Sequence, residues 1–332
     1  MSTAAIASPR RGGAGLSGLV TLSGGLIRRV LAILLALHPL GAILVLGWLM
    51  RLMRAEAGCA RTRFLRGSGP RRAPLPGWLV AGSEERRTPL GRRLGGLWLN
   101  LREGLAALVT IAAGTLPFTL LWLLSWWGGW ENSFNKGYEQ SWIGPTVALI
   151  GVALALPLLA RLPMALAHQA VEGRMSAFFA RRPVGQLIRA AGWRYVGLAL
   201  LTALAALPLF ALQALPTFVE GWRPGFSDRS PEEVEAFIAG YRLLATAYLV
   251  LVLIALRRMA ARLHTSASLV LETHGARAFG VGAALRMGLV LACAFGVVAQ
   301  IFVAQFLNHQ WVVWLLPPFS GLPWFAPLAP VP

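Results

Sequence analysis

Residues 28–54 read RRVLAILLALHPLGAILVLGWLMRLMR, and they pose the first question about the fold. The 21 residues 30–50 carry no charge. As one helix they would measure about 31 Å, which is enough to cross a hydrocarbon core about 30 Å thick. Arginine normally marks the cytoplasmic flank of a span, but here it stands on both flanks. The segment therefore either crosses the membrane or enters it and returns.

A proline interrupts this run near its midpoint. Pro39 removes a helical hydrogen-bond donor and disfavours helix at His38. The arms 30–37 and 40–50 are about 12 and 16 Å long, so each reaches about halfway across. A re-entrant helix–proline–helix segment explains the proline and both basic flanks together, whereas a crossing helix with a proline kink is the alternative. His38 and Pro39 are candidate functional residues, because transporters bind substrates where helices are interrupted.

The composition is that of a membrane protein. The chain of 332 residues is 56% hydrophobic and 13% charged, and its mean hydropathy is +0.62. Its net charge of +18 comes from 31 basic residues against 13 acids. Because the arginines lie between apolar runs, they are typical of cytoplasmic loops that face anionic lipid headgroups. We therefore expect membrane lipids as partners and no binding of nucleic acid.

Five further apolar runs of helical length predict transmembrane helices. They lie at about 104–127, 142–160, 196–216, 241–256 and 287–307. Three alternating loops hold 23 basic residues, whereas the two remaining loops hold four. The three basic loops are therefore expected in the cytoplasm. The predicted fold class is an all-α, polytopic helical bundle in a bacterial inner membrane, with a periplasmic C-terminus.

The predicted organisation has five parts. They are a disordered cytoplasmic tail (1–25), the re-entrant or crossing segment (26–54), a basic cytoplasmic loop with an amphipathic helix (55–103), the transmembrane bundle (104–310) and a periplasmic aromatic, proline-rich surface segment (311–332). The last segment carries no charge and is interrupted by prolines, so it is not a regular span. A membrane protein partner is expected to dock on it.

Two cytoplasmic stretches have the spacing of amphipathic helices. Residues 89–102 and 183–194 each place apolar side chains on one face and arginines elsewhere. Such helices either lie on the inner leaflet or pack on neighbouring helices. In the first case, headgroups would be bound by Arg92, Arg93, Arg102, Arg189 and Arg194.

A weak repeat of about 92 residues relates the spans that begin near 104, 196 and 287. The helices that return to the cytoplasm end in Arg161 and His168 in one unit and in Arg257 and His264 in the next. A separation of seven residues puts arginine and histidine on one helical face in each unit. These four residues are candidate functional residues.

Little else resembles a reactive site. No phosphate-binding glycine loop, HExxH or GxSxG motif is present, and the predicted spans contain no deep acid. We therefore expect no catalytic residue and no cofactor. A metal site is a minor alternative, formed by His168, His264, His274, Glu172 and Glu272 if their helices converge. The polar pair Asn308 and His309 either contacts a partner or caps the last span.

One family resemblance can be stated. The stretch Gly47-Trp48-Leu49-Met50-Arg51-Leu52-Met53-Arg54, followed later by Leu75-Pro76-Gly77-Trp78, resembles an uncharacterised family of bacterial and archaeal polytopic membrane proteins, a domain of unknown function. That family pairs a Gly-aromatic-x-x-Arg-x-x-Arg stretch with a later Leu-Pro-x-Trp. Leu79-Val80-Ala81 stands where the family often has acids. The resemblance implies the membrane architecture and no particular activity.

These observations favour a non-enzymatic role in the membrane. The first reading is an accessory or assembly subunit of a membrane complex, or a lipid-associated scaffold. The second is a transporter or permease for a small solute or lipid, in which the interruption at His38 would matter most. The third is a lipid-modifying enzyme that uses the histidines and acids at the cytoplasmic face.

Overall fold

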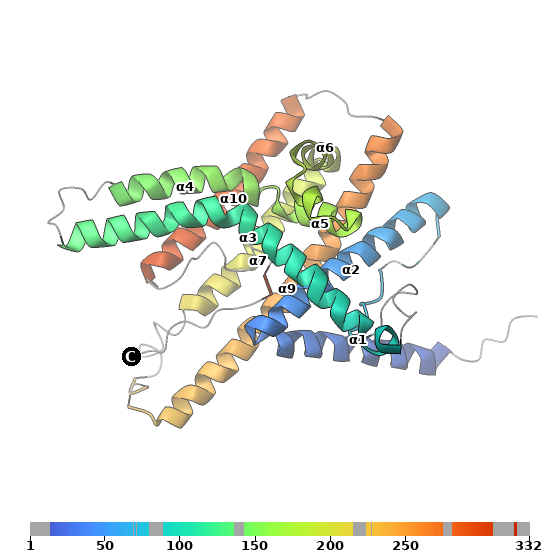
Figure 1. The fold of residues 1–332 in the computed structure, drawn as a ribbon, viewed down its shortest axis with the longest axis horizontal. Helices are drawn as coiled ribbons and strands as arrows, with labels where there is room; N and C mark the ends of the chain where they lie inside the picture. The colour runs from blue at the N-terminus through green and yellow to red at the C-terminus, as the bar shows by residue number, and fades with distance from the viewer. Residues whose placement is uncertain are drawn as a thin grey trace, which may run out of the picture.

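The computed structural model describes residues 14–68, 70, 72–79, 89–135, 143–214, 224–226, 228–274, 281–307 and 322–323, and the regular structure in these ranges is helical (Figure 1). The elements are α1 (Ala14–Ala36), α2 (Pro39–Arg66), α3 (Pro89–Asn135), α4 (Ile143–Leu159), α5 (Leu162–Glu172), the short 3₁₀ helix η2 (Met175–Phe179), α6 (Arg181–Ala191), α7 (Trp193–Ala214), α9 (Pro231–His274) and α10 (Val281–Leu307). The helical class predicted from the sequence is confirmed.

Several of these helices are suited to a membrane. Leu94–Phe118 in α3 and Pro231–Thr273 in α9 are long and apolar enough to cross one. Two bent pairs qualify if each counts as one span: the end of α4 with α5, bent by 44°, and α6 with α7, bent by 98°. The described residues therefore contain two to four candidate spans. The predicted ranges 104–127, 241–256 and 287–307 fall within α3, α9 and α10, and most of the ranges 142–160 and 196–216 falls within α4 and α7.

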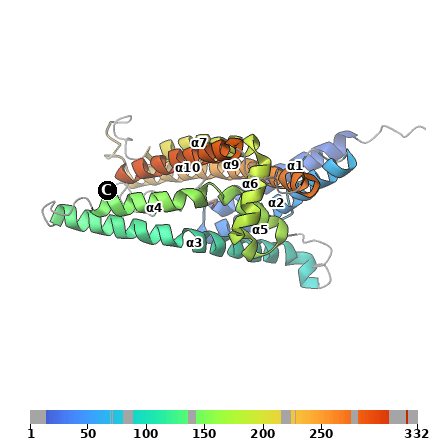
Figure 2. The ribbon, with the colours of Figure 1, turned by 90° about the horizontal axis from the view of Figure 1, so that it is seen from above.

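One face of α3 exposes apolar side chains along much of its length. The exposed positions are Leu94, Trp98, Leu105, Val109, Leu116, Leu120 and Leu124. Their spacing of four and seven residues keeps them on one side of the helix. A continuous exposed apolar stripe is what a helix presents to lipid. Figure 2 shows the α3–α4 pair reaching one end of the molecule, with α1 and α2 at the other.

Helices α1 and α2 form a hairpin that opens from the break at Leu37–His38 (Figure 1). In one straight helix, Arg28 and Arg51 would lie about 35 Å apart along the axis. Instead, Arg28 donates to the carbonyl of Leu75 and Arg51 donates to that of Gly77. These two acceptors are two residues apart, at most about 7 Å. The two arms therefore fold back beside one another.

The break itself follows the sequence. Pro39 occupies the first turn of α2, where its missing N–H costs nothing. His38 is the N-cap, and its Nδ1 accepts from the Leu40 amide at 3.3 Å. The helix–proline–helix shape predicted around His38 and Pro39 is thus present, and both arms are longer than predicted.

Two predicted boundaries need correction. Helix α1 begins at Ala14, inside the stretch 1–25 that was expected to be disordered, because leucine and valine at helical spacing outweigh its glycines; residues 1–13 lie outside the described ranges. The basic loop 55–103 is largely helical, because α2 continues until Gly67, whose φ of 64° ends it. Residues 89–102 are the first turns of α3 and not a separate interfacial helix.

The second amphipathic stretch packs on protein. The predicted apolar face of α6, formed by Val184, Leu187, Ile188 and Ala191, is buried, and α6 packs mainly against α9. Of the two alternatives, packing on neighbouring helices is the one observed.

Helix α2 lies between two apolar clusters and belongs to both. Met50 and Met53 pack into a cluster with α3, α5 and α7, whereas Trp48 and Leu52 pack into one with α1 and α9. The first cluster also contacts Leu322. Leu322 is half-buried and Pro323 is buried, so this part of the predicted surface segment 311–332 packs inward; its other residues lie outside the described ranges.

Glycines let α2 and α3 approach to backbone contact. A Cβ added at Gly47 would lie 1.8 Å from the carbonyl oxygen of Asn100, and one added at Gly104 would lie 2.0 Å from that of Ile43. Neither obstacle is a side chain that can rotate away. Small residues at such crossings are typical of membrane helix pairs.

Replacing Gly47 by alanine is expected to force α2 and α3 apart. The overlap involves two backbones, so the free energy of unfolding should fall by about 3 kcal/mol or more. Gly58→Ala, on the same helix with open space around it, should be neutral or stabilising. Thermal unfolding followed by tryptophan fluorescence compares the two. Equal melting temperatures would contradict the close crossing.

Candidate functional site

An extended segment, residues 73–79, runs between α2 and α3 and is held by side chains from four helices. Pro74 and Pro76 keep it out of a helix, so its carbonyls lack helical partners. Donors from elsewhere replace them. Ala73 O accepts from Arg258 Nη2 (3.0 Å), Leu75 O from Arg28, Pro76 O from Trp48 Nε1 (2.9 Å), Gly77 O from Arg51 Nη1 (3.1 Å), Trp78 O from Asn100 Nδ2 (3.5 Å) and Leu79 O from the Gly96 amide (3.0 Å).

Two tryptophans add an apolar contact to this segment. The rings of Trp48 and Trp78 stack at 5.2 Å with an interplanar angle of 6°. The indole Nε1 of Trp78 donates to the carbonyl of Arg28 at 3.2 Å. Segment 73–79 therefore joins α1, α2 and α3 through both hydrogen bonds and stacking, and we call it the clamped segment.

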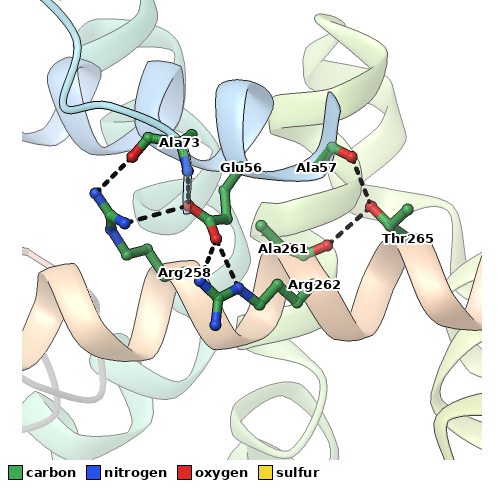
Figure 3. Close-up of polar contacts among 7 residues, drawn as sticks. All are labelled: Glu56, Ala57, Ala73, Arg258, Ala261, Arg262 and Thr265. Carbon is green, nitrogen blue, oxygen red and sulfur yellow. Dashed lines mark hydrogen bonds and ion pairs between the residues drawn. The ribbon is translucent and has the colours of Figure 1, made fainter. Parts of the chain in front are cut away.

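Glu56 on α2 is the charged centre beside the clamped segment (Figure 3). Its residue exposure is 0%. Its carboxylate accepts from the Ala73 amide at 3.0 Å and from Arg262 Nε at 2.6 Å, and it pairs with Arg258 Nη1 at 3.3 Å. Arg258 and Arg262 are one turn apart on α9, so both guanidinium groups reach the same carboxylate. A buried carboxylate needs this compensation, because desolvation of an unpaired charge is costly.

Further polar contacts tie α2 to the helices around it. Arg54 pairs with Glu103 of α3 at 3.0 Å, and its Nε donates to the Ala170 carbonyl of α5 at 2.7 Å. Arg61 and Glu272 form a two-pronged pair at 2.9 and 3.0 Å near the ends of α2 and α9, with both side chains about half exposed. Helix α2 therefore makes polar contacts with α3, α5 and α9 and also contributes to both apolar clusters.

The structure brings the two repeat histidines together. His168 Nδ1 lies 3.1 Å from His264 Nε2, and the ring centroids are 5.4 Å apart. This centroid separation is what two imidazoles have when the bonded nitrogens point at each other. One ring therefore donates and the other accepts, with His168 half-buried on α5 and His264 buried on α9. The contact can pass or share a proton between two helices.

The metal alternative gains no support from this pair. Within the described residues, no group of three or more His, Cys, Asp and Glu side chains is placed to hold a metal ion. Glu272 is held by Arg61, and Glu172 pairs with Arg174 at 3.1 Å. The side chain of His274 lies outside what the structure describes.

The remaining predicted residues are dispersed. Arg161 is the half-buried N-cap of α5, and Arg257 is buried on α9. Arg102 and Arg194 are exposed, whereas the Nε of Arg189 donates to the Gly185 carbonyl at 3.1 Å. Arg92 and Arg93 lie in α3, but their side chains lie outside the described part of the chain, as do Asn308 and His309.

Sequence reasoning missed Glu56 and its partners. The available signals were a single acid within the arginine-rich end of α2 and two arginines spaced by four on α9. The two stretches that carry the family resemblance do meet: Trp48 and Arg51 bind the carbonyls of Pro76 and Gly77. The family itself is a separate matter. The chain matches no protein-family model, and comparisons with curated proteins and with solved structures also found no match.

Glu56→Gln is expected to destabilise the protein strongly. It keeps the side-chain shape but leaves Arg258 and Arg262 without their counter-charge, which costs about 3 kcal/mol in a buried network. Glu272→Gln removes the same charge from an exposed pair and should cost less than about 1 kcal/mol. Thermal or denaturant unfolding of the two variants in the same lipid or detergent gives the comparison. Similar losses in both would show that burial at Glu56 does not matter.

Proposed function

We propose that this protein is a multi-pass integral membrane protein with a structural, non-enzymatic role, as an accessory or assembly subunit of a membrane complex. The observation that supports this proposal is the use made of its partly buried arginines. Arg51, Arg54, Arg258 and Arg262 bind backbone carbonyls or carboxylates of the same chain, as the clamped segment and Glu56 require. Such groups hold helices in place, which is the requirement of a scaffold.

The proposed topology has five spans, in α3, α4, α7, α9 and α10, in a bacterial inner membrane. The α1–α2 hairpin is proposed to enter from the cytoplasm and return there. Exposed Leu26, Ile27, Val30 and Leu34 support this placement, because an apolar outer face on α1 suits lipid. Arginines at the end of α2 and in the second half of α9 support a cytoplasmic location for those parts of the chain.

Lipids and a protein are the proposed partners. Exposed Arg102 and Arg194 are available for anionic headgroups. Segment 311–332 is proposed as the contact with a protein partner, with the packing of Leu322 serving to anchor it.

Purification of the full-length protein from its native host in nanodiscs, with quantitative proteomics, tests the proposal. The expected result is one membrane protein partner at constant stoichiometry. Deletion of 311–332 should release that partner, whereas Leu322→Ala, which removes the inward packing alone, should weaken the association without abolishing it. A homogeneous preparation without a protein partner would contradict the subunit role. Equal loss of the partner in both variants would contradict docking on 311–332.

A further inference from the structure

Four arginines converge beside the clamped segment from three parts of the chain. Arg258 and Arg262 come from α9 and share Glu56. Arg72 directly precedes Ala73, whose amide and carbonyl bond to Glu56 and Arg258. Arg29 directly follows Arg28, which donates to Leu75 and accepts from Trp78. The exposed Arg29 and Arg72 are therefore placed near Arg258 and Arg262.

The charge here is far from balanced. Arg262, Arg72 and Arg29 all act on Arg258 as like charges, and Glu56 is the carboxylate that opposes them. Three other carboxylates in the described part of the chain pair elsewhere: Glu103 with Arg54, Glu272 with Arg61 and Glu172 with Arg174. Among the described residues, these four guanidinium groups exceed the charge of the Glu56 carboxylate by three positive charges. Such repulsion is relieved when an anion binds.

We infer that Arg29, Arg72 and Arg262, supported by Arg258, form a binding site for a phosphate group. Guanidinium forks match phosphate oxygens in a two-pronged geometry and stay charged at any physiological pH. Exposure of the side chains rises across this cluster. Glu56 is 1% exposed, Arg258 13% and Arg262 35%, and Arg29 and Arg72 are exposed residues. The Glu56 carboxylate therefore holds the less exposed guanidinium groups in place, and the more exposed ones bind the phosphate group.

Two sources supply this chemistry. One is the headgroup of an anionic phospholipid, and the other is a phosphorylated solute or free phosphate. The site does not depend on the proposed subunit role, because its residues are distinct from segment 311–332 and it would bind either ligand in a protein without a partner.

The experiment uses full-length protein in nanodiscs and follows thermal unfolding. In one arm, phosphatidylglycerol replaces phosphatidylcholine in steps; in the other, sodium phosphate is added to phosphatidylcholine nanodiscs, with sodium chloride at matched ionic strength as the reference. The wild-type melting temperature should rise in at least one arm. Arg29→Gln/Arg72→Gln should weaken the apparent affinity by about 30-fold. Arg181→Gln/Arg182→Gln, which removes two exposed charges at the start of α6, should leave it unchanged.

The two arms separate the sources. A response to phosphatidylglycerol alone assigns a lipid headgroup, and a response to phosphate assigns a site open to solutes. Arg29→Lys/Arg72→Lys keeps both charges but loses the two-pronged geometry, so it should bind more tightly than the glutamine variant and less tightly than the wild type, which guards against a folding defect in the glutamine variant. No response in either arm would overturn the inference. An equal weakening in both glutamine double variants would also overturn it, because it would reduce the effect to net charge.

Discussion

Backbone carbonyls in an extended, partly buried segment must find donors outside regular structure, and this requirement organises the protein around residues 73–79. The donors come from α1, α2, α3 and α9, and most of them are arginine, tryptophan or asparagine side chains that are long enough to reach across a helix. Charge-assisted bonds of this kind are stronger than neutral ones. The clamped segment therefore fixes the mutual positions of the consecutive helices α1, α2 and α3 and of α9, which is distant in sequence.

Glu56 makes this arrangement possible. Without its carboxylate, the guanidinium groups of Arg258 and Arg262 on α9 would face the clamped segment without the counter-charge that both of them share. With it, α2 and α9 are joined by contacts between residues 206 apart, and the amide of Ala73 is satisfied as well. The same charge distribution leaves the outer arginines in excess. The contacts that hold α2 and α9 together and the proposed phosphate site therefore arise from the same group of charged side chains.

Local patterns in the sequence predicted a good part of this fold. Apolar runs located the helices, Pro39 located the break between α1 and α2, and the spacing in 183–194 identified the buried face of α6. The separation of seven residues in two units singled out His168 and His264, which do meet. Each of these features depends on residues within a few turns of one another.

Features that depend on distant residues could not be predicted in this way. The residues near Gly47 in the sequence do not indicate that the Asn100 carbonyl lies against it. Those near Glu56 do not indicate that Arg262 is its partner. The extent of α2 and α3 was also missed, because a basic stretch reads as a loop when the acids and carbonyls that neutralise it are far along the chain. The candidate site consists almost entirely of such distant contacts.

We propose that the clamped segment holds α1 and α2 as a hairpin whose two outer ends lie on the same side of the membrane. Single cysteines at Ser2 and Ser68, in a background with Cys59 and Cys293 changed to serine, test it with a membrane-impermeant maleimide. Ser68 is exposed just after α2. We predict that both positions react in inside-out vesicles and that neither reacts in intact cells. Labelling of the two positions from opposite sides would mean that the segment crosses the membrane and would contradict the account.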